Sequence, residues 1–183
     1  MLNCFTYCKK LSLCLTGLLA VLILATPVTA ETIYANDEDT LPRVDPMAWI
    51  NENYLSQQRT RINEILRDNY ARSFRGGVAD FRLLQRLIDE QVIPKTDTQS
   101  LQAMGVILGD IYVSQVEGLE WGVYEDELGR SHAVCAVNTK ECLFVTTMLS
   151  RRIEVGVKPN VKRVYDKGLM QIKPFLPKRP FSD

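Results

Sequence analysis

The chain lacks most of the sequence motifs that usually carry catalysis or metal binding. It has one histidine, no glycine-rich phosphate loop and no cluster of metal ligands in its sequence. Lysine plus arginine and aspartate plus glutamate are balanced at 22 each, so the basic excess typical of a nucleic-acid-binding protein is absent. Hydrophobic residues make up 46% and charged residues 24% of the 183 residues, which excludes a disordered or fibrous chain. We expect one globular domain that uses no cofactor or metal.

A long apolar run occurs at the N-terminus. Two lysines precede the apolar residues 11–25, and small residues occupy the −3 and −1 positions of a cleavage site between Ala30 and Glu31. A membrane-spanning helix needs about 20 apolar residues, and this run is shorter. The pattern predicts that residues 1–30 are a signal peptide and that the remainder is periplasmic or secreted and does not span the membrane. An uncleaved membrane anchor is the alternative.

Only two cysteines follow the predicted signal peptide, Cys135 and Cys142. A two-residue turn at Asn138 and Thr139 would place them opposite each other on a hairpin, at a separation compatible with a disulfide. The oxidising compartment outside the cytoplasm would preserve such a bond. We predict the disulfide, with a reduced buried pair as the alternative. A metal site that adds His132 lacks a fourth ligand.

The segment after the signal peptide changes character at Pro46. Residues 31–45 are acidic and have no periodicity, which predicts a flexible leader. Asp45 followed by Pro46 is a typical helix start, with a capping residue and proline at the first helical position. An amphipathic helix is therefore expected over 46–70, with Trp49 and Ile50 among its apolar positions.

Two further helices are expected before the first strand, over 78–91 and 98–117. The second of these is apolar nearly all round, which predicts a central buried helix. It contains Gly105 and Gly109, one turn apart. Glycine costs about 1 kcal/mol relative to alanine inside a helix. Another element is therefore expected to approach this face closely.

The remaining sequence predicts strands and then helices. Short segments with strand character cover 119–125, 131–137 and 142–147, and their short connections predict a three-stranded antiparallel meander. Closing helices are expected over 148–154 and 159–172. Helices followed by strands indicate an α+β fold, in which N-terminal helices and the central buried helix pack on the meander and the C-terminal helices close it.

This pattern sets the expected limits of the domain. We expect a single α+β domain over 46–173, followed by a proline-rich basic tail over 174–183. Basic side chains accumulate from Lys158 onward. They favour a solvated helix face and tail, with weak contact to anionic lipid or to an acidic partner as the alternative.

Asp110 is an ionisable residue within the apolar helix. A carboxylate there must be paired, hydrogen-bonded or protonated. We favour a structural ion pair with an arginine, for which Arg130, Arg151 and Arg152 are the candidates. The alternative is an acid/base or cation-binding carboxylate.

The first hairpin carries a second group of acidic residues, Glu125, Asp126 and Glu127. Adjacent residues on a strand point to opposite faces, so these three carboxylates cannot all converge. The stretch favours a solvated turn in which Gly129 takes a positive φ. Trp121, earlier on the same strand, is expected to pack into the core; a ligand platform is the alternative.

Four short motifs together resemble one bacterial family. They are MGVILGD at 104–110, GLEW at 118–121, EDELGR at 125–130 and RRIE at 151–154. In order and spacing they resemble the domain-of-unknown-function family numbered 3806, over roughly residues 75–165. The resemblance implies a compact α+β domain. It implies no reaction and no catalytic or binding residue.

The sequence favours a function without catalysis. We expect a non-enzymatic protein-binding module of the bacterial cell envelope, of the accessory, inhibitor or immunity type, with an envelope protein as partner and no role in binding nucleic acid. The alternative is a small periplasmic hydrolase that uses Asp110 with Glu120 or Asp126.

Overall fold

The computed structural model describes residues 41–177. The predicted signal peptide with its cleavage site, most of the acidic leader and the end of the basic tail lie outside these residues. In chain order the elements are β1 (Arg43–Pro46), α1 (Trp49–Tyr70), α2 (Asp80–Asp89), α3 (Thr98–Gln115), β2 (Leu119–Asp126), β3 (Gly129–Ala136), β4 (Cys142–Leu143), α4 (Val145–Glu154), α5 (Val161–Ile172) and the short 3₁₀ helix η2 (Lys173–Phe175). The predicted α+β class is confirmed.

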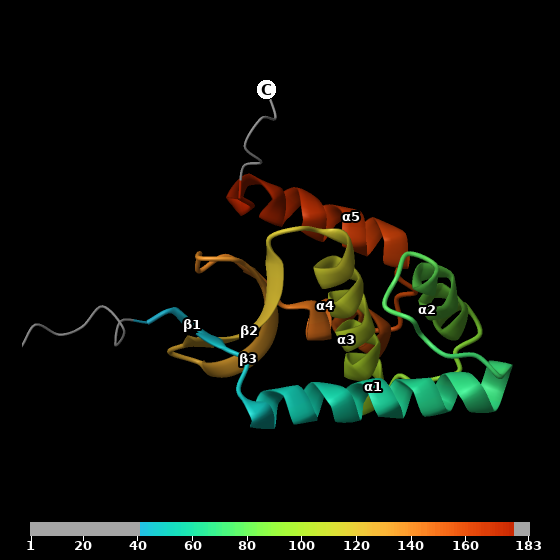
Figure 1. Cartoon of the computed structure of the whole chain (residues 1–183). Helices are drawn as coiled ribbons and strands as arrows, with labels where there is room; N and C mark the ends of the chain where they lie inside the picture. Colours follow the sequence, from blue (N-terminus) through green and yellow to red (C-terminus); the bar gives the residue numbers. More distant parts are fainter. Residues whose placement is uncertain (1–40, 178–183) are drawn as a thin grey trace, which may run out of the picture. The chain divides into compact units, whose positions relative to one another are not determined.

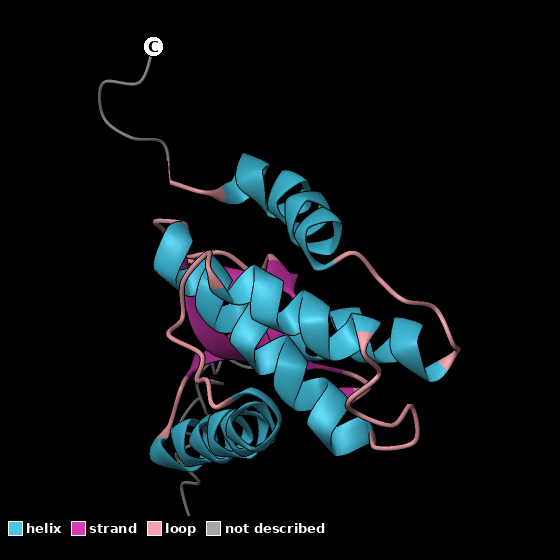
Figure 2. Cartoon of the chain, turned by 90° about the vertical axis from the view of Figure 1, so that its right-hand side faces the viewer, coloured by secondary structure: helices cyan, strands magenta, loops and turns pink. Residues whose placement is uncertain are grey.

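Helix α3 is the central buried helix that the sequence predicts. Eleven of its 18 residues are buried, and the Asp97 side chain caps its first turn by accepting a hydrogen bond from the Ser100 backbone N–H. In Figure 1, α1 runs below α3 and α5 lies above it; Figure 2 shows the same order from the side, with α1 nearly end-on. Helix α4 packs along α3, and the sheet covers the remaining side.

The sheet has four antiparallel strands in the order β1-β2-β3-β4, one more than the predicted meander. The added strand is β1, which pairs with β2 from Arg43 opposite Glu125 to Pro46 opposite Gly122. The end of the predicted flexible leader is therefore an edge strand. Proline is tolerated at such an edge, where its missing N–H costs no ladder bond. Helix α1 consequently begins at Trp49 and not at Pro46.

The last predicted strand is also shorter than expected. β4 contains two residues, and α4 starts at Val145, within the segment predicted as strand. The β-branched residues Val145, Thr146 and Thr147 favour strand by propensity. Packing against α3 overrides that preference, because the first turn of α4 lies directly on Gly105 of α3.

The two glycines of α3 confirm the predicted close approach. A Cβ atom at Gly105 would lie 2.5 Å from the Val145 carbonyl oxygen and 2.6 Å from the Thr146 Cα. A Cβ atom at Gly109 would lie 2.3 Å from the indole ring of Trp121. The absence of a side chain at both glycines therefore allows α4 and the Trp121 side chain of β2 to contact the backbone of α3.

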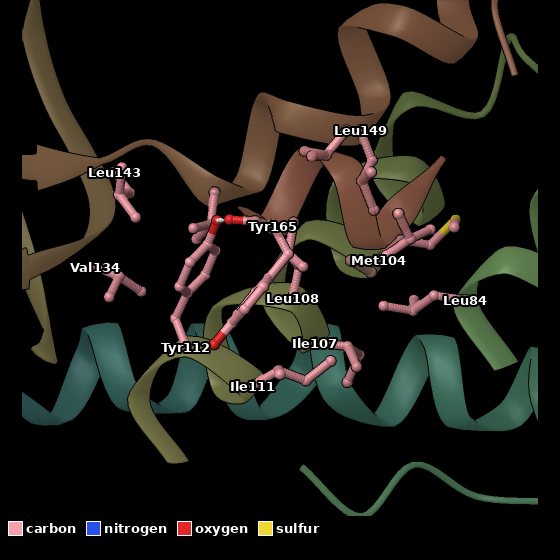
Figure 3. Packing of buried hydrophobic residues seen from close by; sticks show 14 of the residues in the cluster. Leu84, Met104, Ile107, Leu108, Ile111, Tyr112, Val134, Leu143, Leu149 and Tyr165 are labelled. Carbon is pink, nitrogen blue, oxygen red and sulfur yellow. Dashed lines mark hydrogen bonds between the residues drawn. The ribbon is translucent and has the colours of Figure 1, made fainter. Parts of the chain in front are cut away.

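Two tyrosines fix α5 to the central helix. The buried Tyr112 hydroxyl donates a hydrogen bond of 2.6 Å to the Tyr165 carbonyl, and the two rings stack with centroids 4.3 Å apart. Burial raises the pKa of Tyr112, so its hydroxyl stays a donor. Figure 3 shows this pair within the core, where residues of α3 face the sheet and α4.

Helix α1 covers α3 on the other side through its buried residues Leu55, Ile62 and Leu66. None of the helices within residues 41–177 combines the length and the apolar character needed to cross a membrane.

Candidate functional site

Asp110 of α3 joins three elements through its carboxylate. Arg59 of α1 donates from Nε to Oδ2 and from Nη2 to Oδ1, each at 2.8 Å. The indole Nε1–H of Trp121, on β2, donates to Oδ1 at 3.0 Å. The hydrogen bond to Asp110 raises the pKa of Arg59. The geometry is a bidentate ion pair in which the planar guanidinium matches the carboxylate.

The structural ion pair is therefore present, but its expected partners were wrong. Asp110 pairs with Arg59, 51 residues earlier in the chain, and not with Arg130, Arg151 or Arg152. Arg59 lies on the polar side of α1, where the periodicity alone indicates solvent. Only the packing of α1 across α3 places it beside the carboxylate.

The other carboxylates of the hydrolase alternative do not meet Asp110. Glu120 precedes Trp121 on β2, and neighbouring residues of a strand point to opposite faces. Asp126 is five residues beyond Trp121, roughly 17 Å along the strand. The two oxygens of Asp110 already accept three hydrogen bonds. The arrangement holds elements together and offers no paired acid and base.

The β2–β3 hairpin has the predicted turn. The Asp126 carboxylate accepts a hydrogen bond from the Leu128 backbone N–H at 2.8 Å, and Gly129 has a φ of 124°. An aspartate that caps its own turn is a common turn-forming device. Asp126 and Gly129 are thus explained by the local backbone.

Arg130 belongs to a network of ion pairs on one face of the sheet. It donates to Asp45 of β1 at 3.0 Å, and its Nε lies 3.6 Å from Glu125. Arg43 of β1 donates to the same Glu125 at 2.8 Å. These charges neutralise one another and fasten the edge strand to the hairpin.

The predicted disulfide is confirmed. Cys135 and Cys142 lie opposite each other in the β3–β4 register, with an S–S distance of 2.07 Å. Both sulfurs are used, so the alternative metal site with His132 is wrong. His132 instead stacks on Tyr54, with ring centroids 4.7 Å apart, and its Nε2 lies 3.1 Å from the Asn51 side-chain oxygen. No metal-binding group of three or more histidine, cysteine or acidic residues occurs in the described part of the chain.

The remaining predicted residues lie apart from the Asp110 cluster. Arg152 is exposed on α4 and donates to the Met148 carbonyl of its own helix. Within the basic C-terminal region, Lys162 pairs with Asp166 on α5. Much of the predicted tail lies outside the described residues, so lipid contact there stays a prediction.

Trp121 lies between two hollows of the surface. One, of about 510 Å³, is lined by Arg59, Asp110 and Phe74 among others. The second, of about 560 Å³, is lined by Met47, which lies between β1 and α1, and by residues of β1, α1 and β2 among others. Val113 and Trp121 line both hollows, which we together call the Trp121 groove. Trp121 is half-buried: its ring packs on Gly109 of α3, and the side chain also lines both hollows of the groove.

Exposed apolar side chains lie beside this groove. Trp49 is 78% exposed and Ile50 is 63% exposed, although the helical periodicity assigned both to a buried face. Trp49 precedes Glu52 by one helical turn, and Glu52 lines the second hollow. Helical periodicity does not reveal this patch, because α1 begins at Trp49 and its first turn extends past the core.

The charge beside Trp49 is negative. Glu52 and Glu120 both line the second hollow and are exposed. Neither forms a salt bridge with another residue of the described region. The groove therefore offers apolar and aromatic surface next to two exposed carboxylates, although Glu52 also lies within electrostatic range of Arg59.

Comparison with known proteins explains the shared motifs. Residues 80–165 match the family described as "Domain of unknown function (DUF3806)". This part of the chain belongs to the DUF3806 family. The DUF3806 region runs from the start of α2 to Tyr165 in α5, so that β1 and α1 precede it. Its motif residues Gly105, Gly109 and Asp110 here serve packing and hydrogen bonding.

One solved structure shows that the DUF3806 region and its surroundings share a known fold. A crystal structure from Bacteroides thetaiotaomicron VPI-5482, at 1.50 Å resolution, superposes with a TM-score of 0.64 and 16% sequence identity. The match covers 73% of this chain and 49% of that chain, so the chain spans about half the length of that protein. At this identity the likeness shows the fold alone. No curated protein matches the chain.

Proposed function

We propose that this protein is an exported, non-enzymatic protein-binding module of the bacterial cell envelope and that the Trp121 groove with Trp49 and Ile50 is its interface. The observation that carries the proposal is the exposure of Trp49 beside a groove. Tryptophan, methionine and arginine are enriched where protein interfaces bury their cores. Here Trp49, Met47 and Arg59 lie in or next to one groove.

The negative charge of the groove indicates the charge of the proposed partner. An envelope protein that presents an apolar side chain flanked by lysine or arginine would cover Trp49 and pair with Glu52 and Glu120. Opposite charges around an interface speed association and fix its orientation more than they add affinity. The proposed partner is therefore a basic and apolar protein surface.

Export is supported by two independent features. Residues 1–30 have the pattern of a signal peptide, and the Cys135–Cys142 disulfide is of the kind that persists outside the reducing cytoplasm. Mass spectrometry of the protein from a periplasmic extract tests this point. We expect a mature chain that begins at Glu31; a chain that retains residues 1–30 would contradict cleavage.

The interface is tested by capture of the partner. The tagged full chain is expressed in its host, and proteins crosslinked to it in the envelope are quantified by mass spectrometry. The double variant Trp49→Ala with Ile50→Ala is compared with Val78→Ala with Met170→Ala, whose side chains are also exposed but lie outside the groove. We expect the first variant to lose at least tenfold of the captured partner, since central interface residues cost about 2 kcal/mol or more. Equal capture by both variants would reject the interface.

The charged part is tested separately on the same helix. Glu52→Lys reverses a carboxylate of the groove, whereas Glu64→Lys reverses an exposed carboxylate of α1 that does not line it. Glu52→Lys should slow association with the captured partner and Glu64→Lys should not. The difference should shrink at high salt, because exposed charges are screened.

A further inference from the structure

A second concave site lies on the side of α3 that faces α2 and the α4–α5 connection. It is a pocket of about 430 Å³ that shares no residue with the Trp121 groove. Its floor is apolar and is formed by Leu87, Ile88, Ile93, Leu101, Met104 and Ile153. We call it the lysine-rimmed pocket, because Lys95 and Lys158 line its opening.

Local backbone structure holds the wall of this pocket. After α4, Gly156 takes a φ of +84° and turns the chain. The Val157 backbone N–H then donates to the Arg152 carbonyl at 2.9 Å, which places the Val157 side chain at the pocket. Lys158 donates from Nζ to the Asp89 carbonyl at 3.0 Å. One cation is therefore fixed at the rim by a hydrogen bond to the C-terminal end of α2, without a carboxylate partner.

The charge at this opening has one sign. No aspartate or glutamate lines the pocket, and within residues 41–177 neither Lys95 nor Lys158 forms a salt bridge. An apolar pocket with a few polar groups at a fixed position is the usual form of a small-molecule site. The volume falls within the range of about 300–1,000 Å³ for such sites.

We propose that the lysine-rimmed pocket binds a linear aliphatic carboxylic acid. The hydrocarbon chain lies on the apolar floor and the carboxylate pairs with Lys95 and Lys158 at the opening. The apolar floor selects the chain and the two unpaired cations select an anionic head group. This site is independent of the proposed protein interface.

The chemistry predicts how affinity changes with the ligand. Each methylene group moved from water to an apolar site contributes about 0.8 kcal/mol, which is about a fourfold gain in affinity. Decanoate should therefore bind about tenfold or more tighter than octanoate until the pocket is filled. Decanol has the same chain without the charge, and it should bind more weakly than decanoate.

The test is a calorimetric titration of the purified protein, expressed as the full chain, with decanoate below its micelle-forming concentration. Val157→Glu places a carboxylate at the opening, where the side chain is 52% exposed. Val155→Glu is the matched control, since that side chain is 76% exposed and does not line the pocket. We expect saturable binding of one decanoate, a loss of at least tenfold in Val157→Glu and no change in Val155→Glu.

A second pair of measurements tests the head group. Lys95→Gln with Lys158→Gln should weaken decanoate by about threefold to tenfold, the range for two partly exposed ion pairs, and should leave decanol unchanged. The proposal is overturned if decanoate does not saturate the protein, if the two valine variants bind alike, or if decanol and decanoate bind equally. Saturation by an acidic leucine-containing peptide but not by decanoate would assign the pocket to a protein partner and would also overturn it.

Discussion

Gly105→Ala tests the contact between α3 and α4 most directly. On helix propensity alone this change should stabilise the protein by about 1 kcal/mol. The structure predicts the opposite sign. The new Cβ atom would lie 2.5 Å from the Val145 carbonyl oxygen and 2.6 Å from the Thr146 Cα, whereas ordinary contact begins near 3.4 Å. The first turn of α4 would have to move by about 0.9 Å.

The neighbouring atoms belong to backbone and cannot rotate away. Overpacking a dense core typically costs about 1–3 kcal/mol. Here the new Cβ atom on the α3 backbone would meet backbone atoms of α4, so we expect a cost at or above the upper end of that range. After the propensity gain, we expect a net loss of about 2 kcal/mol in the free energy of unfolding. Gly77→Ala is the control, because a Cβ atom there meets nothing within 4 Å and no positive φ is required.

Urea unfolding followed by circular dichroism measures both variants. The midpoint for Gly105→Ala should fall clearly below that of the wild type, while Gly77→Ala should be unchanged or slightly stabilised by its stiffer unfolded chain. A Gly105→Ala protein as stable as the wild type would refute the reasoning, because it would mean that α4 can withdraw from α3 at little cost.

Three further predictions concern contacts elsewhere in the fold. Asp110→Asn should lower the free energy of unfolding by about 2 kcal/mol in urea titrations, since it removes a charged acceptor that is 19% exposed; a change below about 0.5 kcal/mol would contradict this. Replacing Cys135 and Cys142 together by alanine should cost about 2–3 kcal/mol, the value for closing a loop of this length, and reductant should then no longer alter the thermal midpoint. Burial, and secondarily the charge of Arg130, lower the pKa of His132, so the unfolded chain takes up its proton first. The free energy of unfolding should therefore fall as pH drops below about 6.5, and His132→Gln should flatten that slope; equal slopes would refute the effect.

The sequence predicted the structure correctly where the local backbone or the strand register alone determines the role of a residue. Gly129 at a turn, Cys135 opposite Cys142 and the two glycines of α3 each predicted a geometry that the structure contains. The α+β class followed from the order of helical and strand periods. These features depend on backbone conformation and on short-range register, both of which leave a visible pattern in the residues.

Features that depend on distant packing were not visible. The sequence pattern places Arg59 on the solvent-exposed side of its helix. In the structure α1 crosses α3, and this packing brings Arg59 to Asp110. The pairing of β1 with β2 recruits residues with no strand periodicity. The exposure of Trp49 depends on where α1 extends beyond the core. Arg59 and β1 each depend on a partner more than 50 residues away in the chain, and Trp49 is exposed because no element of the described region covers it. The periodicity of a short segment contains no information on either point.

Helix α1 lies outside the residues that match the DUF3806 family, yet it belongs to the same compact unit as α3. It buries Leu55, Ile62 and Leu66 and supplies the guanidinium that neutralises Asp110. A protein cut to begin at residue 80 would expose one apolar side of its central helix and leave that carboxylate without its cation. The family match thus covers less of the chain than the packed core to which α1 contributes. We therefore expect a stable fragment to include helix α1, which begins at Trp49.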